Sequence, residues 1–437
     1  MANAANVDPT LSPPRVASQH RLAWLDGLRA VAALLVVYAH LSRYLFRDVR
    51  AVSGEWLHAG TAGVMLFFLV SGYIIPASLE RHGSLRSFWI SRAFRLLPLY
   101  LVVGLAVVVL GENGLVPMDG YLSDHPFPAA VAHATMLPDM LGVPLASAVF
   151  WTLSFEMAFY LIVSALFTLR LHTANAAVAV SLAVLAVVTA PLTPRQISSV
   201  PGVGNILTMG VAVCLAAGLV AVTSARRWAV RAGGLVLAGI AGLLLVANQE
   251  PAHVWDGLLI VAVMFVGTTL YRADRGQTNW WCAGMVAGVV AAALLSNWIA
   301  ELQSLGALTL RYQVRSVVTL LTFSGLFAIG RLTSGRRAPR PLVMLGMISY
   351  SIYLVHYVLI KALDPILANL ADRLSPIAQI PVLVLFLGVL IGISWVTYRI
   401  VEIPGQKLGR RIDRLVAPPS RVASPPGDRE VLSPGRR

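Results

Sequence analysis

The sequence contains few charged residues for its length. Asp, Glu, Lys and Arg make up 12% of the 437 residues, hydrophobic residues make up 57%, and the mean hydropathy is +0.74. A soluble domain has about twice that share of charge. The composition therefore excludes a disordered chain, a nucleic-acid-binding domain and an ordinary cytosolic enzyme. Because the apolar residues suffice for about twelve spans of ~20 residues, we expect a polytopic membrane protein.

Cysteine and lysine are nearly absent. The two cysteines, Cys214 and Cys282, lie far apart in apolar segments. They fit neither a metal-ligand spacing nor a disulfide framework, so we expect small buried side chains there and no metal site. Only 2 of the 34 basic residues are lysine, and the rest are arginine. Together with abundant Ala and Val, this bias is typical of a GC-rich bacterial genome.

Hydrophobic runs broken by Arg, Gly and Pro clusters predict an all-α polytopic bundle of 10–12 transmembrane helices. Segment 21–411 forms this transmembrane domain, and segments 1–20 and 412–437 are expected to be disordered cytoplasmic tails. We find no repeat that relates the two halves of the chain. The runs lie at 28–46, 60–79, 95–111, 149–169, 174–191, 204–223, 229–247, 255–271, 281–299, 314–330, 342–363 and 379–403.

The distribution of Lys and Arg predicts the orientation of the chain. If the N-terminus is cytoplasmic, 26 of these residues fall on the inner side and 8 on the outer side. Segment 112–148 contains neither Lys nor Arg. Because cytoplasmic loops are rich in basic residues, we expect both termini in the cytoplasm. The net charge of +14 then lies mainly on the inner face, where anionic lipid or an anionic cytosolic ligand can bind.

Ionisable side chains within the predicted spans are candidate functional groups, because charge is costly in a bilayer. Arg29 and His40 share one face of the first span and lie about 16 Å apart along its axis. Glu156 and Tyr160 share a face of the fourth span, with Glu156 about 10 Å deep. The alternative is structural: a snorkelling arginine, a buried histidine with a hydrogen-bond partner, or a carboxylate bound to a neighbouring helix.

Two further spans contain pairs of this kind. Tyr353 and His356 share a face of the eleventh span, where a packed core histidine is the alternative. Arg92 and Arg95 begin the third span, where they could hold phosphate groups or simply anchor the inner helix end.

Helical depth predicts a site with two levels. The outer level contains three titratable residues, His40, Glu156 and His356. The inner level is a basic mouth near the inner membrane boundary, formed by Arg29, Arg92, Arg95 and Arg399, and Glu402 lies at the same height.

Six segments, in order, resemble the acyltransferase-3 family of integral-membrane O-acyltransferases. They span residues 21 to 404, and we expect a stand-alone member without a C-terminal hydrolase-like domain. The segments are Arg29 to His40, Phe68 to Tyr73, Arg92 to Pro98, Trp151 to Tyr160, Ser349 to His356 and Tyr398 to Pro404. The family's functional first-span Arg and His and third-span Arg pair correspond to Arg29, His40, Arg92 and Arg95. Met157 stands where the family commonly has a second acidic residue.

The resemblance implies transfer of an acyl group, with acetyl expected, from cytosolic acyl-CoA to a hydroxyl of a sugar-containing acceptor. The acceptor could be an envelope polysaccharide, a glycolipid or a small glycosylated metabolite. We expect an enzyme of the bacterial inner (plasma) membrane, in contact with lipid, with no metal cofactor and no nucleic-acid partner. Direct transfer and a covalent acyl-enzyme both remain open.

We assign hypothetical roles on this basis. His40 is the general base, Glu156 orients it or relays its proton, and Arg29 steadies the acyl carrier. The expected substrate-binding residues are Arg92, Arg95, Ser71, Tyr73, Tyr160, Tyr353, His356 and Glu402. The alternative functions are a transporter or flippase for an anionic or glycolipid substrate, which the lack of a repeat disfavours, and a membrane sensor or scaffold.

Overall fold

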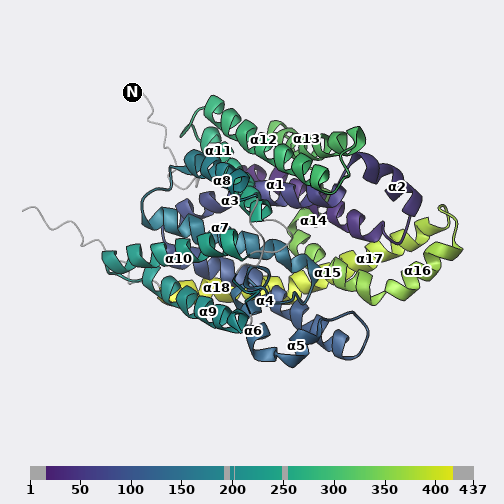
Figure 1. The fold of residues 1–437 in the computed structure, drawn as a ribbon, viewed down its shortest axis with the longest axis horizontal. Coiled ribbons are helices and arrows are strands. Elements are labelled where there is room, and N and C mark those ends of the chain that lie inside the picture. The colour runs from purple at the N-terminus through teal and green to yellow at the C-terminus, as the bar shows by residue number, and fades with distance from the viewer. Residues whose placement is uncertain (1–15, 191–196, 201, 249–253, 417–437) are drawn as a thin grey trace, which may run out of the picture.

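The computed structural model describes residues 16–190, 197–200, 202–248 and 254–416 (Figure 1). Within these ranges the chain forms helices and no strand, which confirms the predicted all-α class. The α-helices are α1 (Val16–Leu41), α2 (Arg47–Trp56), α3 (Ala59–His82), α4 (Leu85–Glu112), α5 (Gly120–Asp124), α6 (Pro126–Thr135), α7 (Trp151–Thr168), α8 (Asn175–Thr189), α9 (Val203–Val222), α10 (Arg227–Ala247), α11 (Val254–Asp274), α12 (Trp280–Ser304), α13 (Leu310–Leu332), α14 (Arg340–Met347), α15 (Ser349–Ala362), α16 (Asp364–Arg373), α17 (Gln379–Thr397) and α18 (Ile403–Val416). Short 3₁₀ turns lie at Asp139–Leu141 and Ala148–Phe150, and a π-helical turn at Tyr398–Glu402 joins α17 to α18.

The helices account for every predicted span. In the described part of the chain, ten helical segments are long and apolar enough to cross a membrane, α8 is a shorter apolar helix, and α14 and α15 form one bent pair. The predicted range of 10–12 spans is therefore confirmed. The direction in which the chain crosses the membrane remains a prediction from its charge distribution.

The eleventh predicted span is broken, with α14 and α15 inclined at 69°. The break at Ile348 turns α14 against α1. There Gly346 lies so close to Asp26 that a Cβ atom would be 2.0 Å from the Asp26 carbonyl oxygen. A hydrophobicity profile does not detect such a break, because both halves are apolar.

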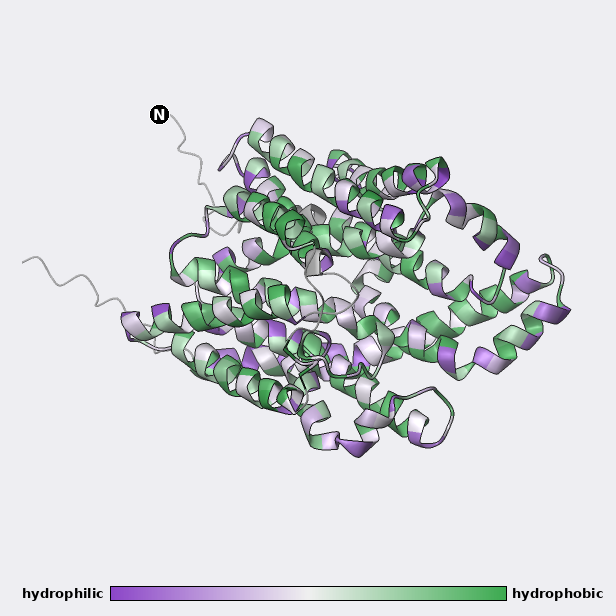
Figure 2. Cartoon of the chain, viewed as in Figure 1, coloured by the Kyte–Doolittle hydropathy of each residue, from purple (hydrophilic) through white to green (hydrophobic). Residues whose placement is uncertain are grey.

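The core of the bundle lies at α3, α7 and α11, whose apolar segments are mostly buried. By contrast, α9, α12, α13 and α17 expose many large apolar side chains, as expected for helices that face lipid. In Figure 1, α12 and α13 form the upper edge and α9 lies at the lower left, and Figure 2 shows hydrophobic residues along these outer helices.

Both helical ends extend beyond the predicted transmembrane domain. Helix α1 begins at Val16 and α18 ends at Val416, so five residues of each predicted tail are helical. The rest of the predicted tails, 1–15 and 417–437, lies outside the described residues.

Both cysteines are free, but Cys214 is exposed on α9, so the expectation that it is buried is wrong. Val213 and Val220 on this outer helix are also exposed, as suits a lipid-facing surface.

Helices α3 and α11 make an unusually close backbone contact. A Cβ atom at Gly72 would lie 1.8 Å from the Met264 carbonyl oxygen, and one at Gly267 would lie 2.3 Å from the Leu69 carbonyl oxygen. The hydroxyl of Thr268 donates a hydrogen bond to the Gly72 carbonyl oxygen at 2.8 Å. Glycines allow this approach as they do in other membrane helix pairs.

We expect Gly72→Ala to destabilise the protein, because even one methyl group overlaps backbone that cannot move independently. Overpacking of this kind costs about 1–3 kcal/mol or more. Thermal unfolding in detergent, followed by size-exclusion fluorescence, measures the effect. The control is Gly210→Ala on α9, where a new methyl group meets nothing within 4 Å. Equal melting temperatures for the two variants would contradict the proposed packing role.

Candidate active site

A first cavity, of about 80 Å³, lies where α1, α3, α4, α7 and α15 meet. The structure thus brings together side chains from five segments of the sequence that were predicted separately. The predicted site residues that line this cavity are Arg29, Ser71, Arg92, Arg95, Glu156 and Tyr353.

Arg92 is the most buried of the three arginines, with 7% of its surface exposed. Its Nη2 donates a hydrogen bond to Ser78 Oγ at 2.8 Å, and its guanidinium lies 5.7 Å from the ring centroid of Phe88 and 6.0 Å from that of Tyr160. Aromatic faces attract cations. Arg92 is therefore held by a hydroxyl and two rings, not by a carboxylate within ion-pair distance.

Glu156 supplies negative charge to this cavity. The Tyr160 hydroxyl donates a hydrogen bond to Glu156 Oε1. Tyr160 is fully buried against Phe88 and Trp89, so it fixes the carboxylate from behind while Glu156 stays half-buried at the cavity wall. At the same wall, Arg29 lies 3.8 Å from Asp26. The cavity therefore combines a surplus of guanidinium groups with one positioned carboxylate.

A second cavity, of about 330 Å³, contains His40. The Nδ1 atom of His40 lies 3.0 Å from the Val36 carbonyl oxygen. Because a carbonyl oxygen can only accept, this contact places the proton of a neutral His40 ring on Nδ1. Nε2 then retains its lone pair and is free to accept a proton.

His356 lies behind His40. Its Nε2 is 3.4 Å from His40 Nδ1, and its own Nδ1 is 3.1 Å from the Ile352 carbonyl oxygen. The same argument places the His356 proton on Nδ1, so its Nε2 can act only as a second, more distant acceptor of the single Nδ1 hydrogen that His40 donates to Val36. His356 is completely buried, and the Tyr357 ring packs edge-on against His40. The Val36 carbonyl oxygen therefore sets the tautomer of His40, and His356 and Tyr357 pack against the ring and hold its orientation.

The two cavities meet at Val64 and Tyr353, which line both. The Tyr353 hydroxyl lies 2.8 Å from Thr152 Oγ1 and 3.1 Å from the Val149 carbonyl oxygen. The first cavity, which the arginines line, and the second cavity, which contains His40, therefore share a wall.

Glu156 and His40, for which similar depths were predicted, lie in different cavities. Glu156 lines the first cavity with the arginines, whereas His40 contacts Val36, His356 and Tyr357. Among the described residues, the side chain that contacts the His40 ring nitrogen is His356, not Glu156. Helical depth gives the height of a residue, but it does not give its direction around the bundle.

Four predicted substrate-binding residues line neither cavity: Tyr160 and His356, which contact Glu156 and His40, and also Tyr73 and Glu402. The Tyr73 hydroxyl donates a hydrogen bond to Asp274 Oδ2 at 2.6 Å, and Asp274 also accepts from Arg331 Nε at 2.7 Å. Glu402 is buried and accepts a hydrogen bond from the Ser351 hydroxyl. Tyr73 and Glu402 therefore each link two helices. This role cannot be inferred from the sequence, because the partner residues are distant along the chain.

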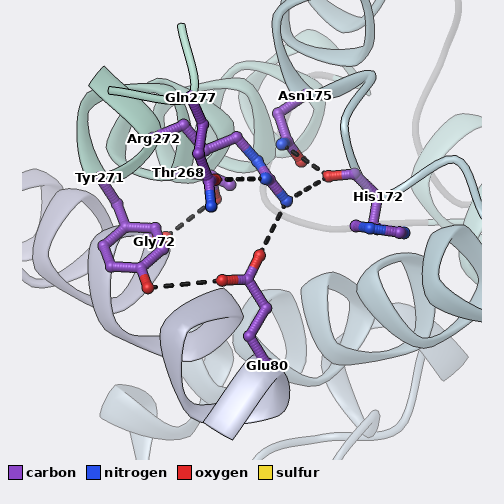
Figure 3. Close-up of polar contacts among 8 residues, drawn as sticks. All are labelled: Gly72, Glu80, His172, Asn175, Thr268, Tyr271, Arg272 and Gln277. Atoms are coloured by element: carbon purple, nitrogen blue, oxygen red, sulfur yellow. Dashed lines mark hydrogen bonds and ion pairs between the residues drawn. The ribbon is translucent and has the colours of Figure 1, made fainter. Parts of the chain in front are cut away.

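A partly buried ion pair that the sequence analysis did not identify, between Arg272 and Glu80, links α11 to α3 (Figure 3). Arg272 Nη2 lies 3.0 Å from Glu80 Oε1 and donates to the His172 carbonyl oxygen at 2.5 Å, while Nη1 donates to Gln277 at 2.7 Å. Tyr271 also reaches Glu80, at 3.4 Å. These residues come from segments separated by up to about 200 positions, so no local motif signals the network.

Comparison with known proteins gives a consistent family. The family model described as Acyltransferase domain matches residues 22–228 and 206–399. Acyltransferase MdmB of Streptomyces mycarofaciens is 34% identical over 156 residues, which cover 34% of this chain and 39% of that protein. Peptidoglycan O-acetyltransferase OatA of Listeria monocytogenes is 30% identical over 155 residues, which cover 32% of this chain and 23% of that protein. The chain thus spans well under half of the length of these relatives. No solved structure matches it.

We expect diethyl pyrocarbonate to modify His40 and to spare His356 in the folded protein. The reagent needs an accessible unprotonated ring nitrogen, which His40 presents to the second cavity, whereas His356 is completely buried. Mass spectrometry of proteolytic peptides locates the adducts after brief labelling at neutral pH. The control is the same reaction after denaturation, where both histidines become accessible. Prior modification of His356 in the folded protein would contradict the arrangement.

Proposed function

This chain belongs to the integral-membrane acyltransferase family defined by the Acyltransferase domain, and from that membership we propose that it is a membrane O-acyltransferase. It moves an acyl group, with acetyl as the expected one, from acyl-CoA to a hydroxyl of a carbohydrate or glycolipid acceptor. The observation that carries the proposal is the shared wall at Tyr353 between an arginine-lined cavity and the cavity of a positioned histidine.

The first cavity is the donor side in this proposal. Acyl-CoA is polyanionic, and Arg29, Arg92 and Arg95 offer charge-assisted and bidentate contacts to its phosphate groups. Glu156 limits the repulsion among these guanidinium groups, and Tyr160 holds Glu156 in place. Ser71 and Tyr353 complete the walls. The predicted inner position of this mouth agrees with a cytosolic donor at the plasma membrane.

The second cavity supplies the base and holds the acceptor. His40 Nε2 takes the proton of the acceptor hydroxyl as its oxygen attacks the thioester carbonyl carbon. The C–O bond forms and the C–S bond breaks, and the imidazolium returns the proton to the departing CoA thiolate. His356 is a positioning residue, because it touches His40 and lies buried behind it. Direct transfer needs no additional nucleophile.

The carbohydrate acceptor class is inferred from a relative. The Listeria protein is named a peptidoglycan O-acetyltransferase, which favours a sugar hydroxyl as the acceptor here. Membranes that contain this chain, supplied with radiolabelled acetyl-CoA, should transfer label to envelope carbohydrate or lipid. Movement of unmodified substrate without label transfer would contradict the proposal and favour a transporter.

We expect His40→Ala to reduce acyl transfer by about 10²–10⁴-fold, the usual contribution of a general base. His356→Gln should retain more activity than His356→Leu, because the amide oxygen of glutamine can still accept from His40 Nδ1. Initial rates with labelled acetyl-CoA measure both effects, and unchanged melting temperatures show that the variants are folded. Near-wild-type transfer by folded His40→Ala would remove the general base from the proposal.

We expect Arg95→Gln to raise the KM for acetyl-CoA about tenfold or more, with a smaller change in kcat, because one charge-assisted contact to the donor is lost. The matched control is Arg399→Gln. Arg399 is exposed, stacks on Trp395 at 5.0 Å and does not line the first cavity. Steady-state kinetics at varied acetyl-CoA separate the two constants. Equal effects of the two variants would contradict a specific donor contact.

A further inference from the structure

The second cavity has a strongly positive lining. Beside His40 and His58, it is lined by three arginines: Arg43 and Arg50, in the segment from the end of α1 to α2, and Arg315 on α13. No Asp or Glu is among its described lining residues. An adjoining cavity that shares His58 and Arg315 does contain one carboxylate, Glu301.

Two of these arginines, Arg50 and Arg315, are held by neutral groups. Arg50 Nη1 donates hydrogen bonds to the Ala39 carbonyl oxygen at 2.8 Å and to Ser42 Oγ at 3.2 Å. Arg315 donates to the Gly54 carbonyl oxygen at 3.3 Å and stacks on Tyr312 at 4.5 Å. Such contacts orient a guanidinium group without neutralising its charge. They also leave other N–H groups of the same guanidinium available to bind a ligand.

Neighbouring arginines of the same region show the contrast. Arg47 lies 2.8 Å from Asp372, and Arg311 lies 2.9 Å from Glu55. Both of these ion pairs lie outside the cavity lining. Within the described residues, the cavity arginines have no carboxylate within ion-pair distance, although carboxylates are available nearby.

The positive charge is strong enough to act on a neighbouring ring. The surrounding protein removes water from His58, and the charges of Arg315, Arg50 and Arg43 add to this effect, so the pKa of His58 is lowered. A bound anion would offset these charges.

The location of these arginines is also unusual. The charge distribution assigns only 8 Lys and Arg residues to the outer side, where basic residues are uncommon, and Arg43, Arg50 and Arg315 are three of them. Arg29 lies twelve residues before the end of α1 at Leu41, or about 18 Å along the helix, and Arg43 lies beyond that end. The second cavity is therefore a basic site separate from the donor arginines.

We propose that the second cavity binds an anionic saccharide, whose carboxylate or phosphate lies against Arg43, Arg50 and Arg315 while a hydroxyl reaches His40. Guanidinium groups bind both of these oxyanions in a bidentate manner. The inference rests on the proposed function, because it takes the occupant of this cavity to be the acyl acceptor. It adds a requirement for negative charge that a general sugar-binding site would not have.

Binding of defined sugars to the purified full chain tests the inference without the acyl donor. The chain is placed in phosphatidylcholine nanodiscs, and trigalacturonate is compared with its neutral methyl ester, and glucose 6-phosphate with glucose. We expect at least one anionic sugar to bind about tenfold or more tightly than its neutral partner, and to slow modification of His40 by diethyl pyrocarbonate.

Variants of the arginines locate the binding. Arg43→Gln and Arg315→Gln should each lower the affinity for the anionic sugar about tenfold. Arg50→Lys, which keeps the charge, should lower this affinity less. Arg47→Gln and Arg311→Gln are the matched controls, since both arginines are nearby but already paired. Equal binding of acid and neutral sugars, or equal effects of cavity and control variants, would overturn the inference.

Two further outcomes separate the possible failures. If phosphatidylglycerol added to the nanodiscs displaces the sugar and alone protects His40, the occupant is a lipid headgroup and the saccharide is excluded. If label transfer from acetyl-CoA succeeds while acid and neutral sugars bind equally, only this inference fails. If charge-selective binding is observed but no acyl transfer occurs, the proposed function fails and the anionic site remains.

Discussion

Mutual repulsion among guanidinium groups inside an apolar bundle is the constraint on which the site depends. In a medium of low polarity, such charges separate unless other groups hold them. The protein holds Arg92 with Ser78 and with aromatic faces, and it supplies one carboxylate, Glu156, from α7. Tyr160 fixes that carboxylate. The charge arrangement therefore requires α4 and α7 to keep one relative position. Helix α3, which also lines this cavity, is held in place by its close contact with α11.

Much of the fold was predictable because membrane insertion imposes a simple rule on sequence. Each span must be apolar for about 20 residues, so all twelve runs coincide with helices. The break at Ile348 was not predictable, since it depends on the approach of Gly346 to Asp26, a residue more than 300 positions earlier. Apolar composition encodes the presence of helices, whereas their bends depend on tertiary contacts.

The candidate site was predictable in its residue types and less so in its pairings. Arg29, Arg92 and Arg95 lie in one cavity, as expected from charges at one predicted depth. Glu156 has a height similar to that of His40 but faces the other cavity, because distance along a helix does not give its rotation. Tyr73 is bound to another helix instead, since its partner, Asp274, lies about 200 residues away.

The wall that Tyr353 provides has a consequence for the permeability of the membrane. The proposed transfer brings one substrate into each cavity, and a continuous water column through both cavities would dissipate the proton gradient. The Tyr353 hydroxyl is engaged by Thr152 and the Val149 carbonyl oxygen, and its ring is buried. Because its hydroxyl is hydrogen-bonded to the protein, Tyr353 separates the two cavities by one aromatic ring and limits proton transfer along a chain of waters between them.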